Sequence, residues 1–134
     1  MLFRSEAGGL AVPEPSDALK ARLREFLPAA ASVSNPIDMI ASAGAESYRR
    51  TIEAMLGSEE FDAIVILYIP VDRDDSPSVA CAIREGVQTA RKNGGAGKPV
   101  LSCMMASDEL RSALRLPDEQ IPTYAFPEIG RAHV

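Results

Sequence analysis

The chain has 134 residues, of which 46% are apolar and 25% charged, the length and composition of one ordinary globular domain. Its net charge is -5 and it has no basic stripe, which argues against a nucleic-acid-binding face. The longest apolar stretch, residues 63–71, is too short to span a bilayer, and the N-terminus lacks a signal-peptide pattern. We therefore expect neither a nucleic-acid nor a membrane partner, and two cysteines without pairing or metal spacing fit a cytoplasmic protein.

Strand and helix signals alternate along the first half of the chain. A short extended segment at residues 9–12 is closed by prolines, and helical spacing of leucines follows over residues 16–27, with Ser16 as the N-cap. A second helix is predicted over residues 45–57. The apolar, β-branched run at residues 63–69 predicts a strand that is covered on both faces, as in parallel sheets.

The alternation continues to the end. Ser76 and Pro77 predict a helix start, with Ser76 as the cap and proline at the first helical position. Residues 98–104 predict a strand, residues 107–115 a short helix and residues 121–126 a last strand. This order of elements predicts an α/β fold with a mainly parallel sheet.

Two small-residue features have structural explanations. Cys81 and Cys103 each sit in an apolar run without metal or pairing spacing, so we interpret both as core residues. The glycine-rich segment 94–97 follows a helix and does not open one, which favours a turn over a phosphate cradle.

Motifs of a free-standing enzyme are missing from the sequence. It contains no dinucleotide fingerprint, no phosphate loop and no paired-histidine metal motif, so we assign no catalytic residue and no metal ligand. The acidic residues Asp72, Asp74 and Asp75 suggest either a magnesium site or capping of the helix that follows. We favour capping, because acids stabilise a helix N-terminus.

Pro70, Val71, Ser76 and Ser78 belong to a strand-to-helix turn. In open parallel sheets, ligands bind beyond the carboxyl ends of the strands, where helix N-termini point outward. We therefore expect this helix N-terminus to face an active site, where it would stabilise a phosphate or carboxylate held by a neighbouring domain.

Asn35, Pro36 and Asp38 form the other candidate. Asn and Asp on either side of a proline can lock a turn through hydrogen bonds to the backbone. We expect a structural turn, with a ligand edge or an interdomain contact as the functional alternative.

Both ends of the chain look foreign. Residues 2–5 and 129–134 match peptides translated from a common sequencing-library adapter and its reverse complement. We expect residues 1–5 and 129–134 to be adapter-derived tails, so that residues 6–128 are the domain. His133, the single histidine, is then not natural sequence.

Four sequence blocks in order resemble one known family. These are residues 32–38 (SVSNPID), the segment from Glu46 to Val65, residues 98–101 (KPVL) and residues 121–128 (IPTYAFPE). The chain resembles the NDP-forming acyl-CoA synthetases (ADP-forming acetate–CoA ligases), which are related to succinyl-CoA synthetase.

The resemblance implies a second flavodoxin-like CoA-ligase domain with a three-layer arrangement, truncated at its N-terminal strand. The family reaction is acyl-CoA + ADP + phosphate ⇌ acid + CoA + ATP, through acyl phosphate and phosphohistidine. The parent enzyme would use CoA, ATP or ADP and magnesium. Its CoA-binding, histidine-bearing and ATP-grasp domains, in the same chain or a partner subunit, would be this domain's partners.

The same resemblance implies that the phosphorylated histidine lies in another domain. The fragment alone would bind no cofactor and be inactive. The helix starting near Ser76 resembles one that faces the phosphohistidine in succinyl-CoA synthetase, but Pro70-Val71-Asp72 replaces the glycine-rich turn found there. Two alternatives remain: a stand-alone flavodoxin-like interaction or regulatory module, and part of a protein acetyltransferase fusion.

Overall fold

The structure is a computed structural model that describes residues 6–71, 75–94, 97–119 and 121–125. It divides into two compact units, residues 1–43 and 44–134. The two predicted tails, including His133, and the acidic residues Asp72 and Asp74 lie outside the described residues.

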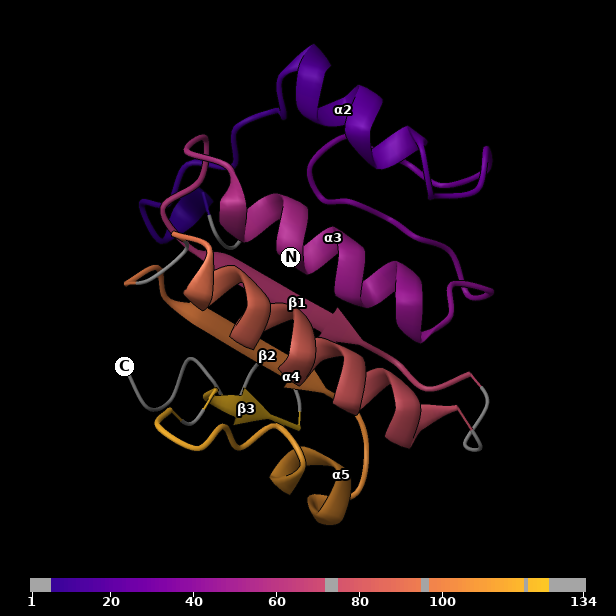
Figure 1. Cartoon of the computed structure of the whole chain (residues 1–134), viewed down its shortest axis with the longest axis vertical. Coiled ribbons are helices and arrows are strands. Elements are labelled where there is room, and N and C mark those ends of the chain that lie inside the picture. Colours follow the sequence, from indigo (N-terminus) through magenta and orange to yellow (C-terminus); the bar gives the residue numbers. More distant parts are fainter. Residues whose placement is uncertain (1–5, 72–74, 95–96, 120, 126–134) are drawn as a thin grey trace. The chain divides into compact units, whose positions relative to one another are not determined.

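The first unit is built around helix α2 (Asp17–Arg24), which is drawn in violet in Figure 1. Its N-cap is Ser16, as the sequence predicts, and the Ser16 hydroxyl accepts a hydrogen bond of 3.2 Å from the amide of Leu19. The helix ends earlier than predicted, because the chain turns after Glu25 and the Arg24 guanidinium donates to the carbonyl of Ala31 at 2.7 Å.

The extended segment expected at residues 9–12 forms no strand. The Gly9 amide instead closes a turn by donating to the carbonyl of Glu6 at 3.0 Å, and Gly9 has a φ of 84°. Glycine adopts this left-handed conformation without steric cost, so the backbone turns at the point where the sequence pattern suggested extension.

The second unit holds an open parallel sheet. Its strands are β1 (Ile64–Tyr68), β2 (Val100–Met104) and β3 (Thr123–Tyr124), in the order β1-β2-β3. Both pairings are parallel, with Ile64 opposite Val100 in the first. The predicted α/β class with a parallel sheet is therefore confirmed.

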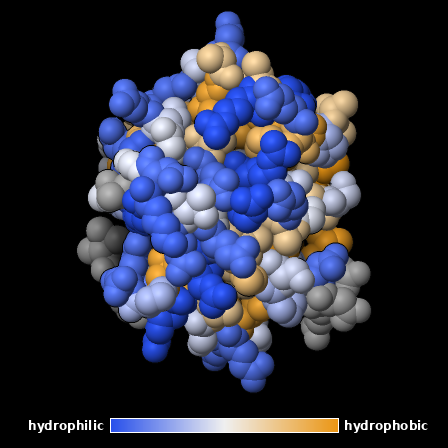
Figure 2. Space-filling model, viewed as in Figure 1, coloured by the Kyte–Doolittle hydropathy of each residue, from blue (hydrophilic) through white to orange (hydrophobic). Residues whose placement is uncertain are grey.

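Three helices accompany the sheet: α3 (Ala45–Gly57), α4 (Ser76–Lys92) and α5 (Asp108–Ser112). Figure 1 shows α3 and α4 side by side in front of the sheet. Gly86 permits this approach, because a Cβ there would lie 3.0 Å from the Arg49 carbonyl oxygen and 3.2 Å from the Ile52 Cβ. The outward side of these helices is mostly hydrophilic in Figure 2.

The core of this unit lies between the sheet and these helices. Ile66 and Tyr68 of β1 are buried against residues of α3 and α4, whereas Val65 and Leu67, which alternate with them, are 52% and 44% exposed. Neighbouring strand residues point to opposite faces. The expectation that β1 is covered on both faces is therefore wrong for the described residues.

Two smaller expectations have mixed outcomes. Cys103 is buried, but Cys81 is only half-buried, and its thiol lies 3.4 Å from a Glu85 carboxylate oxygen. Cys81 therefore faces the polar side of α4 and not the core. Within the described ranges, no helix is long and apolar enough to cross a membrane.

Candidate functional site

A pocket of about 1110 Å³ lies at the carboxyl edge of the sheet in the second unit. Its wall is formed by the residues that follow β1, the start of α4, the segment from the end of β2 through α5, and Ala125 after β3. Because the strands are parallel, their carboxyl ends meet at this one edge, which is where open α/β sheets bind ligands.

Three of the four predicted helix-terminus residues line this pocket: Pro70, Val71 and Ser76. Ser78 does not line it; the residue is exposed on the first turn of α4. The structure thus brings the predicted strand-to-helix turn to a cavity but separates Ser78 from it.

A buried hydrogen bond fixes the start of α4 against β1. The Tyr68 hydroxyl lies 3.1 Å from the Ser76 hydroxyl, and both residues are buried. The Tyr68 ring also packs edge-on against Tyr48 of α3, with centroids 5.6 Å apart. These contacts hold the first residue of α4 at the pocket wall.

The cap of α4 differs from the prediction. Asp75 and not Ser76 occupies the N-cap position, and the Asp75 side chain makes no capping hydrogen bond. The expectation that this carboxylate caps the helix amides is therefore wrong. Its charge still lies next to the positive end of the helix dipole.

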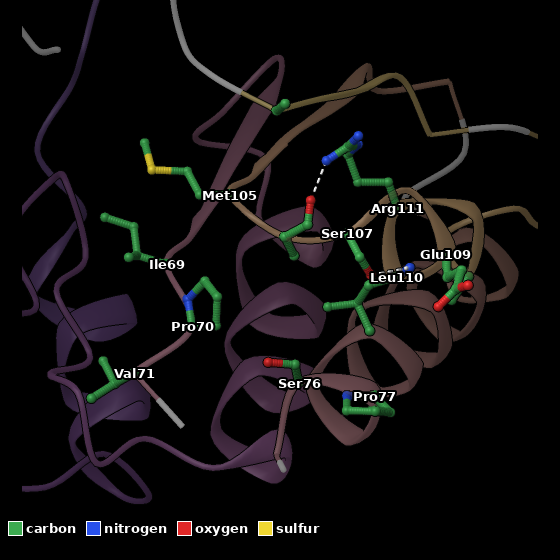
Figure 3. A pocket seen from close by; sticks show the side chains of 13 residues that line it. Ile69, Pro70, Val71, Ser76, Pro77, Met105, Ser107, Glu109, Leu110 and Arg111 are labelled. Carbon is green, nitrogen blue, oxygen red and sulfur yellow. Dashed lines mark hydrogen bonds between the residues drawn. The ribbon is translucent and has the colours of Figure 1, made fainter. Parts of the chain in front are cut away.

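The part of the pocket wall that follows β2, residues 105–113, was not predicted from the sequence as part of a site. Figure 3 shows Ile69, Val71 and Met105 on one side and Glu109, Leu110 and Arg111 on the other. The lining residues after β2 carry no motif. They could have been found by noting that the segment after β2 must reach the same sheet edge as the segment after β1.

Arg111 is the cationic side chain among the described lining residues. Its guanidinium donates to the carbonyl of Ala106 and to the carboxylate of Asp108. The Arg111 side chain is 22% exposed and that of Asp108 is 92% exposed. The ion pair therefore sits at the solvent side of the pocket, where such pairs are weak.

The second candidate, Asn35-Pro36-Ile37-Asp38, lies in the first unit. Its Asn35–Pro36 peptide is cis, the Asn35 side-chain amide donates to the carbonyl of Pro13 at 2.9 Å, and an Asp38 carboxylate oxygen accepts from the amide of Ile40 at 2.9 Å. Ser32 and Asp38 form an isolated antiparallel bridge. The side chains of this segment thus bind backbone groups.

A surface ion pair supports the same segment. The Lys20 ammonium lies 3.0 Å from the Glu14 carboxylate and is the main reason why the pKa of Glu14 falls below its ordinary value. Another Glu14 oxygen accepts from the amide of Asn35 at 3.3 Å. Glu14 therefore links helix α2 to the turn.

The described residues contain no group of three or more His, Cys, Asp or Glu side chains that could hold a metal ion. Of the three acidic residues considered for a magnesium site, Asp75 alone is among the described residues.

Comparison with known proteins identifies relatives, although no family model matches the chain. It is 40% identical over 108 residues to the alpha subunit of an ADP-forming acetate–CoA ligase II of Pyrococcus furiosus, covering 79% of this chain and 23% of that subunit. The chain thus spans about a quarter of the length of this curated relative.

Solved structures agree with this match. An acetyl-coenzyme A synthetase 1 of Ca. Korarchaeum cryptofilum, described as dinucleotide-forming and solved with phosphate and ADP, is 28% identical with a TM-score of 0.77, covering 95% of this chain and 27% of that one. A Pyrococcus horikoshii protein is 32% identical with a TM-score of 0.76, covering 95% and 29%. The resemblance predicted from the sequence blocks is therefore confirmed: the chain is a relative of the NDP-forming acyl-CoA synthetases and corresponds to a domain-sized part of them.

Proposed function

We propose that this chain is the second flavodoxin-like domain of an NDP-forming acid–CoA ligase. The single observation that supports this most is the 40% identity to one domain-sized part of an acetate–CoA ligase subunit. Residues 6–128 form the domain in this proposal, and residues 1–5 and 129–134 are adapter-derived. Reading the source DNA across both ends tests these boundaries.

The proposed role is to complete an active site shared with other domains. The parent enzyme converts acyl-CoA, ADP and phosphate into acid, CoA and ATP through a phosphohistidine. Pro70, Val71 and Ser76 present the start of α4 to the phosphoryl group, which the helix dipole stabilises. Ser78, exposed on the first turn, faces the neighbouring domain.

No residue of this chain is assigned to covalent catalysis. The phosphorylated histidine, the CoA site and the nucleotide with its magnesium belong to the histidine-bearing, CoA-binding and ATP-grasp domains, and the enzyme works in the cytoplasm. The isolated chain is then inactive. The turn at Asn35, Pro36 and Asp38 has a structural role in this proposal, which its side-chain hydrogen bonds to the backbone support, and an interdomain contact is the alternative.

A domain exchange tests the proposed function. Residues 6–128 replace the homologous segment of the Pyrococcus furiosus alpha subunit, and ATP formation from acetyl-CoA, ADP and phosphate is measured with the complete enzyme. We expect activity within about tenfold of the parent, because the exchanged segment holds no covalent catalyst.

Two controls accompany the exchange. The isolated chain should form no ATP above background. A chimera that folds and yet forms no ATP from acetyl-CoA, ADP and phosphate would argue for a stand-alone module instead.

A further inference from the structure

The pocket at the carboxyl edge of the sheet combines an apolar wall with one cationic group. Ile69, Val71 and Met105 form its apolar side, and Arg111 lies across from them (Figure 3). Small-molecule sites have this character: a mostly apolar cavity with a few polar groups that fix the orientation of the ligand.

The Arg111 guanidinium is suited to an oxyanion. Guanidinium carries five N–H donors in a rigid fork, and its contacts with Ala106 and Asp108 use two of them. Among the described residues, the remaining donors are left for a ligand. Planar bidentate contacts of this kind favour carboxylate and phosphate.

The present partner of Arg111 can be displaced. Asp108 is 92% exposed, so the pair is screened by solvent and contributes little. The carbonyl of Ala106 meanwhile holds the side chain in place from the loop after β2. An anion that enters the pocket therefore replaces only the exposed Asp108 carboxylate, and the Arg111 guanidinium is already held in place.

We propose that Arg111 binds the oxyanion of a phosphorylated or carboxylate ligand in this pocket. The proposal rests on the proposed ligase function for its phosphoryl source, and it adds a residue that contacts the anion directly. The start of α4 at Ser76, which lines the same pocket, contributes a positive potential.

Glu109 provides a variant that should change anion binding in the opposite direction from a variant of Arg111. It lines the same pocket and is exposed, so its carboxylate repels an anion held by Arg111. Removing that charge with Glu109→Gln should strengthen anion binding, whereas removing the charge of Arg111 should weaken it.

The experiment measures binding of inorganic phosphate, and separately of acetate, to the full chain by isothermal titration and by amide chemical shifts. We expect Arg111→Gln to weaken binding about tenfold or more, because a charge-assisted hydrogen bond is lost. Arg115→Gln is the matched control. It makes the same charge change four residues on, at an exposed residue outside the pocket lining, and should change binding less than about twofold.

The outcomes separate the alternatives. Phosphate binding without acetate binding assigns the site to a phosphoryl group, and the reverse assigns it to a carboxylate. Equal weakening by Arg111→Gln and Arg115→Gln, or no binding of either anion to the wild-type chain, overturns the proposal. If Arg111→Gln fails to fold, Arg111→Lys keeps the charge but loses the fork and should still weaken binding several-fold; unchanged binding by Arg111→Lys would then overturn it.

The same variants in the domain-exchanged ligase distinguish this proposal from the proposed function. An active chimera whose KM for phosphate is unchanged by Arg111→Gln removes the role of Arg111 and leaves the function standing. An inactive chimera, combined with Arg111-dependent phosphate binding by the chain, removes the function and leaves the anion site standing.

Discussion

The two faces of strand β1 differ although their residues are equally apolar. Ile66 and Tyr68 pack under α3 and α4 and are 6% and 7% exposed, whereas Val65 and Leu67, on the other face, are 52% and 44% exposed. Leu101 of β2, paired with Val65, continues the exposed face. Apolar sequence thus marks residues that can be buried, while the packed helices decide which of them are.

The largest expected effect compares neighbouring residues on these two faces. Ile66→Ala should lower the free energy of unfolding by about 3 kcal/mol, because it opens a cavity in the core. Leu67→Ala should cost about 1 kcal/mol or less, because its side chain already meets solvent. Urea unfolding of the two variants measures both values. Equal losses would mean that the second face is covered in solution.

A second prediction concerns the packing that covers the buried face. Gly86→Val should lower the free energy of unfolding by about 2 kcal/mol, because the new side chain would collide with the backbone of α3 near Arg49. Gly57→Val is the matched control, since a Cβ at Gly57 meets nothing within 4 Å. Comparable urea midpoints for the two variants would show that α3 and α4 do not pack this closely.

A third, smaller loss of stability is expected at Tyr68, at the end of the covered face of β1. Tyr68→Phe removes the hydroxyl that bonds Ser76 and should cost about 1 kcal/mol. Hydrogen exchange of the first-turn amides of α4 should also become faster, since the helix start loses its contact with β1. Tyr124→Phe, on the edge strand β3, is the control, and an identical exchange pattern for both variants would contradict the proposed anchoring of α4.

The sequence predicts the order and type of most elements, and the reasons are local. Helix α3 has the predicted bounds because its apolar spacing and Gly57 define both ends. In contrast, Ile64–Tyr68 is apolar at every position, so no alternation was present to reveal its exposed face. The prediction of an extended segment at residues 9–12 is wrong, because the chain turns at Gly9 instead.

The sequence predicts one part of the candidate site, the turn between β1 and α4, but not the part that follows β2. Pro70, Val71 and Ser76 could be found because a strand, a proline and a helix start follow one another in the sequence. Arg111 lies on a five-residue helix with no motif, and it lines the same pocket as Ser76 because β1 and β2 pair in parallel. That pairing joins residues 36 positions apart, such as Ile64 and Val100, and sequence spacing alone does not specify it.

The smallest expected effect lies on the solvent side of α3, away from both faces of the sheet. Arg49 contacts Glu46 at 2.5 Å and Glu53 at 2.6 Å. The hydrogen bond from Arg49 holds the pKa of Glu46 below its ordinary value of 4.5. A carboxylate whose pKa is lower in the folded state stabilises the fold above its unfolded pKa. That stabilisation is lost as the pH falls through the folded pKa.

Glu46→Gln should therefore lower the urea midpoint slightly at pH 7, and the difference from wild type should shrink as the pH drops below about 4. High salt should shrink it as well, because exposed pairs are screened. The control is Glu59→Gln, at an exposed residue in the turn after α3. A Glu46→Gln difference in urea midpoint that stays constant from pH 7 to pH 2 would mean that the carboxylate charge of Glu46 contributes nothing to stability. Helix α3 would then be stabilised by its packing against the covered face of the sheet.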